Sequence, residues 1–137
     1  MNMQDSHKRQ DGATLVEFAL TIPFLVLLIA GAFDFGWGVY VNNSLALAAR
    51  EGARKGIIVS ATDAQICAQA QRGLQALPTF ACNPSSGPGI YISPATRTST
   101  NPITVTVTYT YTPITPIISP FVPNGIPLSS SSVMVVE

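Results

Sequence analysis

Residues 12–40 read GATLVEFALTIPFLVLLIAGAFDFGWGVY, and no residue from Phe18 to Phe33 is charged. As a helix, this uncharged run would be about 24 Å long at about 1.5 Å per residue. The hydrocarbon core of a bilayer is about 30 Å thick, so the run is slightly short by itself. Trp37 and Tyr40 can extend it, with their rings at headgroup level. The pattern therefore predicts a transmembrane helix from Phe18 to Tyr40.

Two acidic residues, Glu17 and Asp34, flank the uncharged run. On a helix they would be about 25 Å apart. We therefore expect both to lie near a membrane interface rather than at the centre of the bilayer.

The polar residues that precede the apolar run leave three interpretations open. One is a plain transmembrane anchor. The second is a secretory signal peptide, with a basic start and a small-residue cleavage site at residues 30–32. The third is a pilin-type leader that is removed after Gly12. The signal peptide is disfavoured because Glu17 and Pro23 would lie in or beside its apolar region.

The helical pattern continues beyond Tyr40 and separates charged from small side chains. The charged side is formed by Arg50, Glu51, Arg54 and Lys55. Small residues recur on the other side with a small-xxx-small spacing, which lets another backbone approach closely. We expect helix packing through Ala48, Ala49, Gly52, Ala53 and Gly56. The pattern leaves open whether the packing partner is a neighbouring helix in a filament or the protein's own β-sheet.

The motifs between Gly12 and Arg54 form an ordered set. They are Gly12 with Glu17 and Phe18, then Pro23, then Gly31-Ala32-Phe33-Asp34-Phe35-Gly36, then Ala48-Ala49-Arg50-Glu51-Gly52-Ala53-Arg54. Together they resemble the TadE-like family, the minor pilins or pseudopilins of tight-adherence (Flp-type) pilus systems. A weaker resemblance returns from Thr104 to the end.

This resemblance implies that a prepilin peptidase cuts between Gly12 and Ala13. Glycine suits such a site because a backbone without a side chain can approach a protease closely. The resemblance also implies an assembly role for Glu17, with Phe18 beside it: the carboxylate would pair with the N-terminal ammonium of a neighbouring subunit. A carboxylate in apolar surroundings is costly unless it is paired, so this pair would favour the correct register. The residues alone also fit an ordinary interfacial acid that the helix dipole favours.

The remainder of the chain predicts a small domain of helix and sheet. A second helix begins with a capping box at residues 62–65 and ends before Pro78. Alternating apolar residues and threonines indicate a strand with one buried face. Strands of a small antiparallel sheet are expected at residues 90–92, 103–112 and 130–137.

Residues 113–127 are apolar and contain several prolines, which predicts a fixed loop rather than regular structure. The loop either covers the core of the sheet or exposes an apolar patch to partners. Its large apolar residues are Ile114, Ile117, Ile118, Phe121 and Val122.

Cys67 and Cys82 are the only cysteines. Outside the cytoplasm the pair is expected to form a disulfide that ties the short helix to the following loop. Closing a loop of about 15 residues stabilises a fold by roughly 3 kcal/mol in the chain-entropy model. Two reduced, buried thiols are the alternative.

The sequence contains no pattern of catalytic or ligand-binding residues. Its single histidine, His7, lies in the segment that we expect to be removed. We find no nucleophile–base pair, metal-spaced cluster or phosphate-binding loop. Seven acidic residues balance seven basic ones, which argues against a nucleic-acid partner. We expect neither an enzyme nor a bound cofactor or metal.

The sequence thus predicts a pilin-like α+β protein with a leader (1–12), a long helix (13–57) and a periplasmic domain (58–137). The resemblance implies a structural membrane subunit of a pilus or secretion filament. Expected partners are the membrane, other pilin or pseudopilin subunits, the prepilin peptidase and the pilus secretion machinery, with a second copy as a further candidate. The expected location is the bacterial inner membrane, crossed once, or the exterior within a filament. The alternative is an uncleaved, membrane-anchored periplasmic scaffold or binding module.

Overall fold

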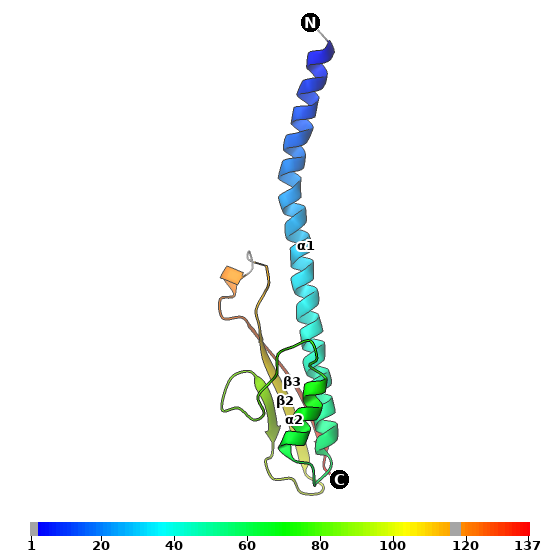
Figure 1. Ribbon diagram of the computed structural model, residues 1–137, viewed down its shortest axis with the longest axis vertical. Helices are drawn as coiled ribbons and strands as arrows, with labels where there is room; N and C mark the ends of the chain where they lie inside the picture. The colour runs from blue at the N-terminus through cyan, green and yellow to red at the C-terminus, as the bar shows by residue number, and fades with distance from the viewer. Residues whose placement is uncertain (1–2, 116–118) are drawn as a thin grey trace. The chain divides into compact units, whose positions relative to one another are not determined.

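The computed structural model describes residues 3–115 and 119–137, with the backbone alone for residues 3–13 and 121. The described residues form a long α-helix, a short α-helix, three strands and a turn of 3-10 helix (Figure 1). The sheet is antiparallel, so the predicted α+β arrangement is confirmed. The chain divides into two compact units, Met1–Gly36 and Trp37–Glu137.

Helix α1 runs from Met3 to Gly56 and continues through Pro23. A single segment in lipid must satisfy its own backbone hydrogen bonds, and a helix does so except for the one bond that a proline cannot donate. The last turn carries Arg54 and Lys55, which oppose the negative end of the helix dipole. The helix therefore combines a long apolar stretch after Gly12 with a basic end.

Helix α2 covers Asp63–Arg72 and begins with the predicted capping box, which is confirmed. The Gln65 N–H donates to the Thr62 hydroxyl oxygen, and the Thr62 N–H donates to the Gln65 side-chain oxygen, both at 3.3 Å. Two of the N–H groups that a helix start leaves unsatisfied are thereby bonded.

The end of α2 differs from the prediction. The helix ends at Arg72 with Gly73 as its C-cap, so the expectation that it continues to Pro78 was wrong. Leu74 lies beyond the helix end but is buried at 1% exposure. The helical spacing of apolar residues therefore extends past the helix into a turn. There, packing against the core rather than helix geometry buries the Leu74 side chain.

The three strands lie in the order β1-β2-β3. Strand β1 covers Gly89–Ser93, β2 covers Pro102–Tyr111 and β3 covers Ile126–Val135. The final strand begins at Ile126, earlier than the predicted Ser130. The prediction was late because Pro127 had been taken as part of a loop. Proline is tolerated near the start of an edge strand, and β3 is such a strand.

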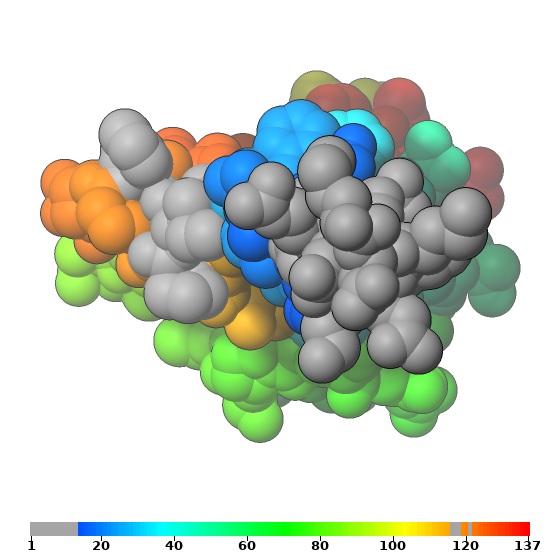
Figure 2. All heavy atoms as spheres, turned by 90° about the horizontal axis from the view of Figure 1, so that it is seen from above, coloured from blue at the N-terminus to red at the C-terminus, as the bar shows by residue number. Residues whose placement is uncertain are grey.

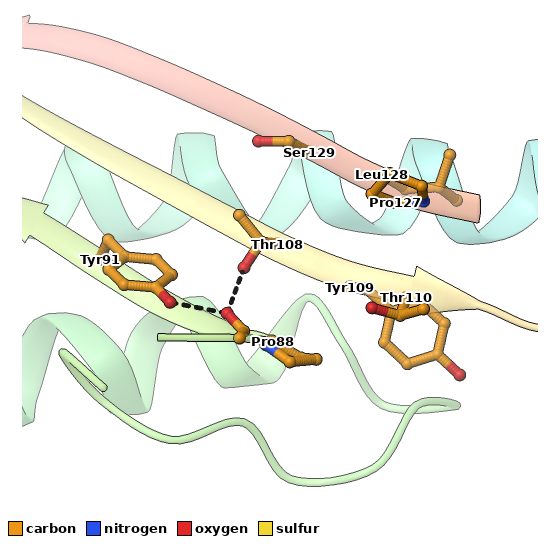
Figure 3. Close-up of a pocket in the computed structure, with 9 residues that line it drawn as sticks. Pro88, Tyr91, Thr108, Tyr109, Thr110, Pro127, Leu128 and Ser129 are labelled. Carbon is orange, nitrogen blue, oxygen red and sulfur yellow. Dashed lines mark hydrogen bonds between the residues drawn. The ribbon is translucent and has the colours of Figure 1, made fainter. Parts of the chain in front are cut away.

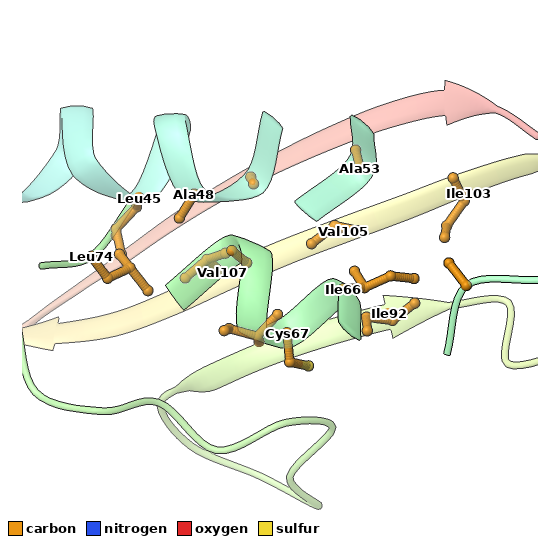
Figure 4. Close-up of a cluster of buried hydrophobic side chains, with 14 of the residues drawn as sticks. Leu45, Ala48, Ala53, Ile66, Cys67, Leu74, Ile92, Ile103, Val105 and Val107 are labelled. Carbon is orange, nitrogen blue, oxygen red and sulfur yellow. The ribbon is translucent and has the colours of Figure 1, made fainter. Parts of the chain in front are cut away.

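The hydrophobic core of Trp37–Glu137 lies between α1, α2 and one face of the sheet (Figure 4). Ala48 of α1, Ile66 of α2 and Val105 of β2 are all fully buried. Full burial of a Val, Leu or Ile side chain stabilises a fold by about 1.5–3 kcal/mol. The largest fully buried side chains are Leu45, Ile66, Leu74, Ile90, Ile103, Val41, Val105, Val107 and Val136.

The proline-rich segment between β2 and β3 contains a turn of 3-10 helix at Ser119–Phe121. Ile114 is 74% exposed, so its side chain does not cover the core. Ile117 and Ile118, which were predicted to belong to this apolar loop, lie outside the described residues, as does the side chain of Phe121.

Candidate assembly and processing site

From Thr14 to Ile29, α1 exposes apolar side chains on all sides. Every described side chain from Thr14 to Ile29 is exposed, and the early part of the helix lies at the surface in Figure 2, in blue. By length and composition, the segment Thr14–Gly56 can cross a membrane. Large exposed apolar surfaces mark contact with lipid or with other proteins. The chain thus fits a single-pass membrane protein.

Glu17 is the one acidic residue in the exposed apolar stretch between Thr14 and Phe33. Its backbone carbonyl accepts a 2.8 Å hydrogen bond from the Thr21 hydroxyl, which is an ordinary contact one helical turn away. No described side chain hydrogen-bonds or ion-pairs with the Glu17 carboxylate. The neighbouring Phe18 is 64% exposed. Both predicted assembly residues are therefore at the surface of the helix.

Gly12 and Ala13, the predicted processing site, belong to the helical backbone of α1. Their side-chain surroundings lie outside what the structure describes. A protease that requires an extended substrate would have to unwind this part of the helix.

Asp34 differs from Glu17 in its surroundings. It is only 7% exposed, although it was expected to resemble Glu17 as an interfacial acid. Asp34 also takes part in a non-covalent interaction. A buried carboxylate needs such a partner because the loss of hydration is costly. The two acids that flank the apolar run are thus not equivalent.

The predicted aromatic anchors stack on one another. The ring centroids of Trp37 and Tyr40 lie 5.2 Å apart, with an angle of 29° between the ring planes. The two residues remain 39% and 43% exposed. They present an amphipathic aromatic surface at the start of the second unit, which suits a membrane–water interface.

The small-residue face of α1 is buried within the second unit. A Cβ added to Gly52 would lie 3.0 Å from Val105 Cγ1 of β2 and 3.1 Å from Ala70 Cβ of α2. A Cβ added to Gly56 would lie 2.5 Å from Ile103 Cδ1. The chain's own sheet and α2 therefore occupy this face, as in one of the two alternatives that the sequence left open. The predicted packing residues are all buried: Ala48, Ala49, Gly52, Ala53 and Gly56.

A disulfide joins Cys67 in α2 to Cys82, with their Cα atoms 5.9 Å apart. The loop that carries Cys82 also covers the outer edge of β1. There, Asn83 N–H donates to Ile90 O at 2.7 Å, and Ile90 N–H donates to Ala81 O at 2.9 Å. The bond thus ties α2 to a segment that protects an edge of the sheet.

Sequence reasoning missed a polar cluster beside this disulfide. Arg97 donates to the Asp63 carboxylate at 2.7 Å and to the Ala61 carbonyl, and its side chain is 8% exposed. The Asn83 amide donates to the other oxygen of Asp63 at 3.0 Å and accepts from the Ile92 N–H at 2.8 Å. The cluster fixes the start of α2, the disulfide loop and β1 together. Only the isolated Arg97 in an otherwise uncharged stretch could have signalled it.

A pocket of about 300 Å³ lies on the face of the sheet opposite the helices (Figure 3). The Tyr91 and Thr108 hydroxyls both donate to the Gly87 carbonyl, at 2.6 and 3.1 Å. These bonds engage both hydroxyls in holding the loop before β1. No charged residue lines the pocket.

Comparison with known protein families gives one match in the part of the chain that holds these features. Residues 12–54 match the family model of TadE-like proteins. The match covers 43 of the 137 residues and begins at the predicted cleavage position. No curated protein and no solved structure matches the chain.

The TadE-like match falls on α1 alone. It includes the exposed apolar helix, Glu17 and most of the small-residue face, and it stops before α2. The disulfide, the Arg97 cluster and the sheet thus lie outside the TadE-like segment. They belong to the part of the chain that this family model does not describe.

Proposed function

We propose that the chain is a structural subunit of a Tad pilus system, cut between Gly12 and Ala13 and assembled through α1. The observation that carries the proposal is the TadE-like match over an exposed apolar helix with one acidic residue near its start. The apolar side chains require lipid before assembly and neighbouring helices afterwards.

Glu17 gives this helix a specific contact. A carboxylate in apolar surroundings is destabilised unless a cation pairs with it. Cleavage after Gly12 creates a new ammonium group on Ala13, and the Glu17 carboxylate of a neighbouring subunit is its complement. The pair would set the axial register between subunits, because a shifted subunit would leave both charges unpaired.

The second unit would lie on the periplasmic side and project from the membrane or filament. The Cys67–Cys82 disulfide supports this location, because disulfides persist in oxidising compartments and are rare in the cytosol. The buried small-residue face then leaves the apolar part of α1 before Trp37, rather than residues 48–56, for contact with other helices.

The N-terminus of the mature protein tests the processing step. We expect mass spectrometry of protein purified from a native host to show Ala13 as the first residue. Deletion of the prepilin peptidase should restore the full-length N-terminus. A mature chain that starts at Met1 would support an uncleaved anchor, and one that starts at Phe33 would support a secreted domain.

Replacement of Glu17 by valine tests the assembly step. We expect Glu17→Val protein to insert in the membrane but to fail to enter pili, because the ammonium of Ala13 loses its partner. Immunoblots of membranes and of sheared pili would measure the two quantities. The matched control is Thr21→Val, one turn along the helix, whose hydroxyl donates to the backbone carbonyl of Glu17. Normal incorporation of the Glu17 variant would remove this residue from the mechanism.

A further inference from the structure

The aromatic pair of α1 indicates where the membrane surface meets the second unit. Trp37 and Tyr40 follow the apolar run one turn after Phe33, with Asp34 between, and stay partly exposed. Their large rings combine an apolar body with a polar N–H or O–H, and such residues concentrate at headgroup level. The level of these two residues along α1 is therefore that of the headgroups.

The end of β2 lies at the same level. A Cβ on Gly38 would lie 3.8 Å from the ring of Tyr111, the last residue of β2. The other end of β2 packs beside the end of α1, where Gly56 meets Ile103. The loop that follows Tyr111 therefore starts at the level of the aromatic pair, and the other end of β2 lies beside the C-terminal end of α1.

Both ends of this loop present an isoleucine. Ile114 follows Tyr111 by three residues and is 74% exposed, and Ile126 is the register partner of Tyr111 and is 41% exposed. Three residues span at most about 11 Å, and the headgroup layer on each side of a bilayer is roughly 5–8 Å thick. Both side chains are thus within reach of that layer.

The composition of the loop also suits contact with lipid. No residue from Thr98 to Val136 is charged, so no charge must be desolvated there. Proline has no backbone N–H, so each proline in the loop removes one polar donor that a lipid contact would leave unsatisfied. The exposed apolar side chains therefore have no charged neighbour in this segment.

We propose that Ile114 and Ile126, at the two ends of the connection between β2 and β3, dock on the lipid headgroup layer of the membrane that holds α1. The proposal rests on the membrane anchoring in the proposed function and is independent of cleavage and of filament assembly. A helix anchored alone can rotate about its own axis. A second contact beside it restricts this rotation and so selects the face of α1 that neighbouring subunits meet.

The test uses the full chain in phosphatidylcholine vesicles. Ile114→Cys is labelled with an environment-sensitive nitrobenzoxadiazole dye, without reductant so that the disulfide stays intact. Nitroxide groups attached to the lipid headgroups serve as shallow quenchers. We expect blue-shifted emission and strong quenching at position 114, and the same behaviour for Ile126→Cys. Trp37 is the only tryptophan, so its own quenching in the same vesicles measures the level of the aromatic pair.

The matched control is Val133→Cys, near the other end of β3, whose exposure of 61% lies between those of Ile114 and Ile126. We expect its dye to emit as in water and to resist quenching. The proposal is overturned if position 114 behaves like position 133 while Trp37 is quenched. It is also overturned if Trp37 itself escapes quenching, or if the dye at position 114 becomes shielded only when another pilus protein is added.

Discussion

At the scale of the residue, close packing around small side chains holds the second unit together. Gly73 caps α2 with φ −74° and ψ −11°, a conformation that alanine adopts readily. The space beside it is occupied, however, because an added Cβ would lie 2.9 Å from both Cα and N of Ala48. These are backbone atoms of α1, which cannot rotate away as a side chain could.

We therefore predict that Gly73→Ala destabilises the protein. The lower entropy of the unfolded chain would favour alanine by about 0.4–1 kcal/mol. Overpacking against a helix backbone costs about 1–3 kcal/mol, so the contact should outweigh the entropy. Urea unfolding of the detergent-solubilised chain, followed by circular dichroism, would measure the loss.

Gly36→Ala is the control for this prediction, because an added Cβ there meets nothing within 4 Å. Its free energy of unfolding should stay the same or rise. Equal stability of the Gly73 and Gly36 variants would show that α1 and α2 can separate at no cost.

The Arg97 cluster shows which residue-scale contacts escape prediction. Asp63 and Arg97 are 34 residues apart in the chain, and Arg97 lies between strands in a segment with no regular pattern. Periodicity reports on contacts within one element, whereas this ion pair depends on how two connections fold over α2. Asp63 was therefore assigned only to the start of a helix.

At the scale of the element, predictions succeeded where one side-chain period persisted. The alternation of threonine and apolar residues predicted β2 to within one residue at each end, and the capping box predicted the start of α2. Predictions failed where a proline alone was used to place the end of a helix or the start of a strand. Pro78 was expected to end a helix that Gly73 ends, and Pro127 was assigned to a loop although it lies in β3.

The disulfide between α2 and its following loop allows a prediction at this scale. Reduction should lower the free energy of unfolding by about 3 kcal/mol, because it frees a loop of 15 residues in the unfolded chain. Thermal unfolding with and without a phosphine reductant would measure the difference. The double variant Cys67→Ala, Cys82→Ala should no longer respond to the reductant. A wild-type chain that is equally stable in both conditions would contradict the prediction.

At the scale of the whole molecule, the proposed topology places the second unit outside the cytoplasm. We predict that a cysteine introduced at the exposed Ser99 reacts with a membrane-impermeant maleimide in intact spheroplasts. The native cysteines should stay unlabelled without reductant, because they are joined to each other. Labelling that requires lysis of the spheroplasts would contradict this topology.

The candidate site could be predicted from the sequence where its residues lie close together along the chain. Gly12, Glu17 and Phe18 lie within one short segment, so their order along one helix defines their relation. The small-residue face was also recognised. The sequence of a helix does not show which element packs against it, so the sheet and α2 were not identified as the packing partners.

The exposed apolar residues of α1 have a consequence for the transfer of this helix from the lipid bilayer to a bundle of helices. Lipid tails and packed leucine, valine and phenylalanine side chains are similarly apolar, so moving this helix from a bilayer into a bundle of like helices changes its hydrophobic free energy little. For these side chains the free energies of the two environments are almost equal, so neither environment is strongly favoured. A single carboxylate that finds its counter-ion in only one phase is then enough to bias the transfer. In the proposed assembly, Glu17 would set the direction of a transfer that the apolar side chains leave nearly balanced.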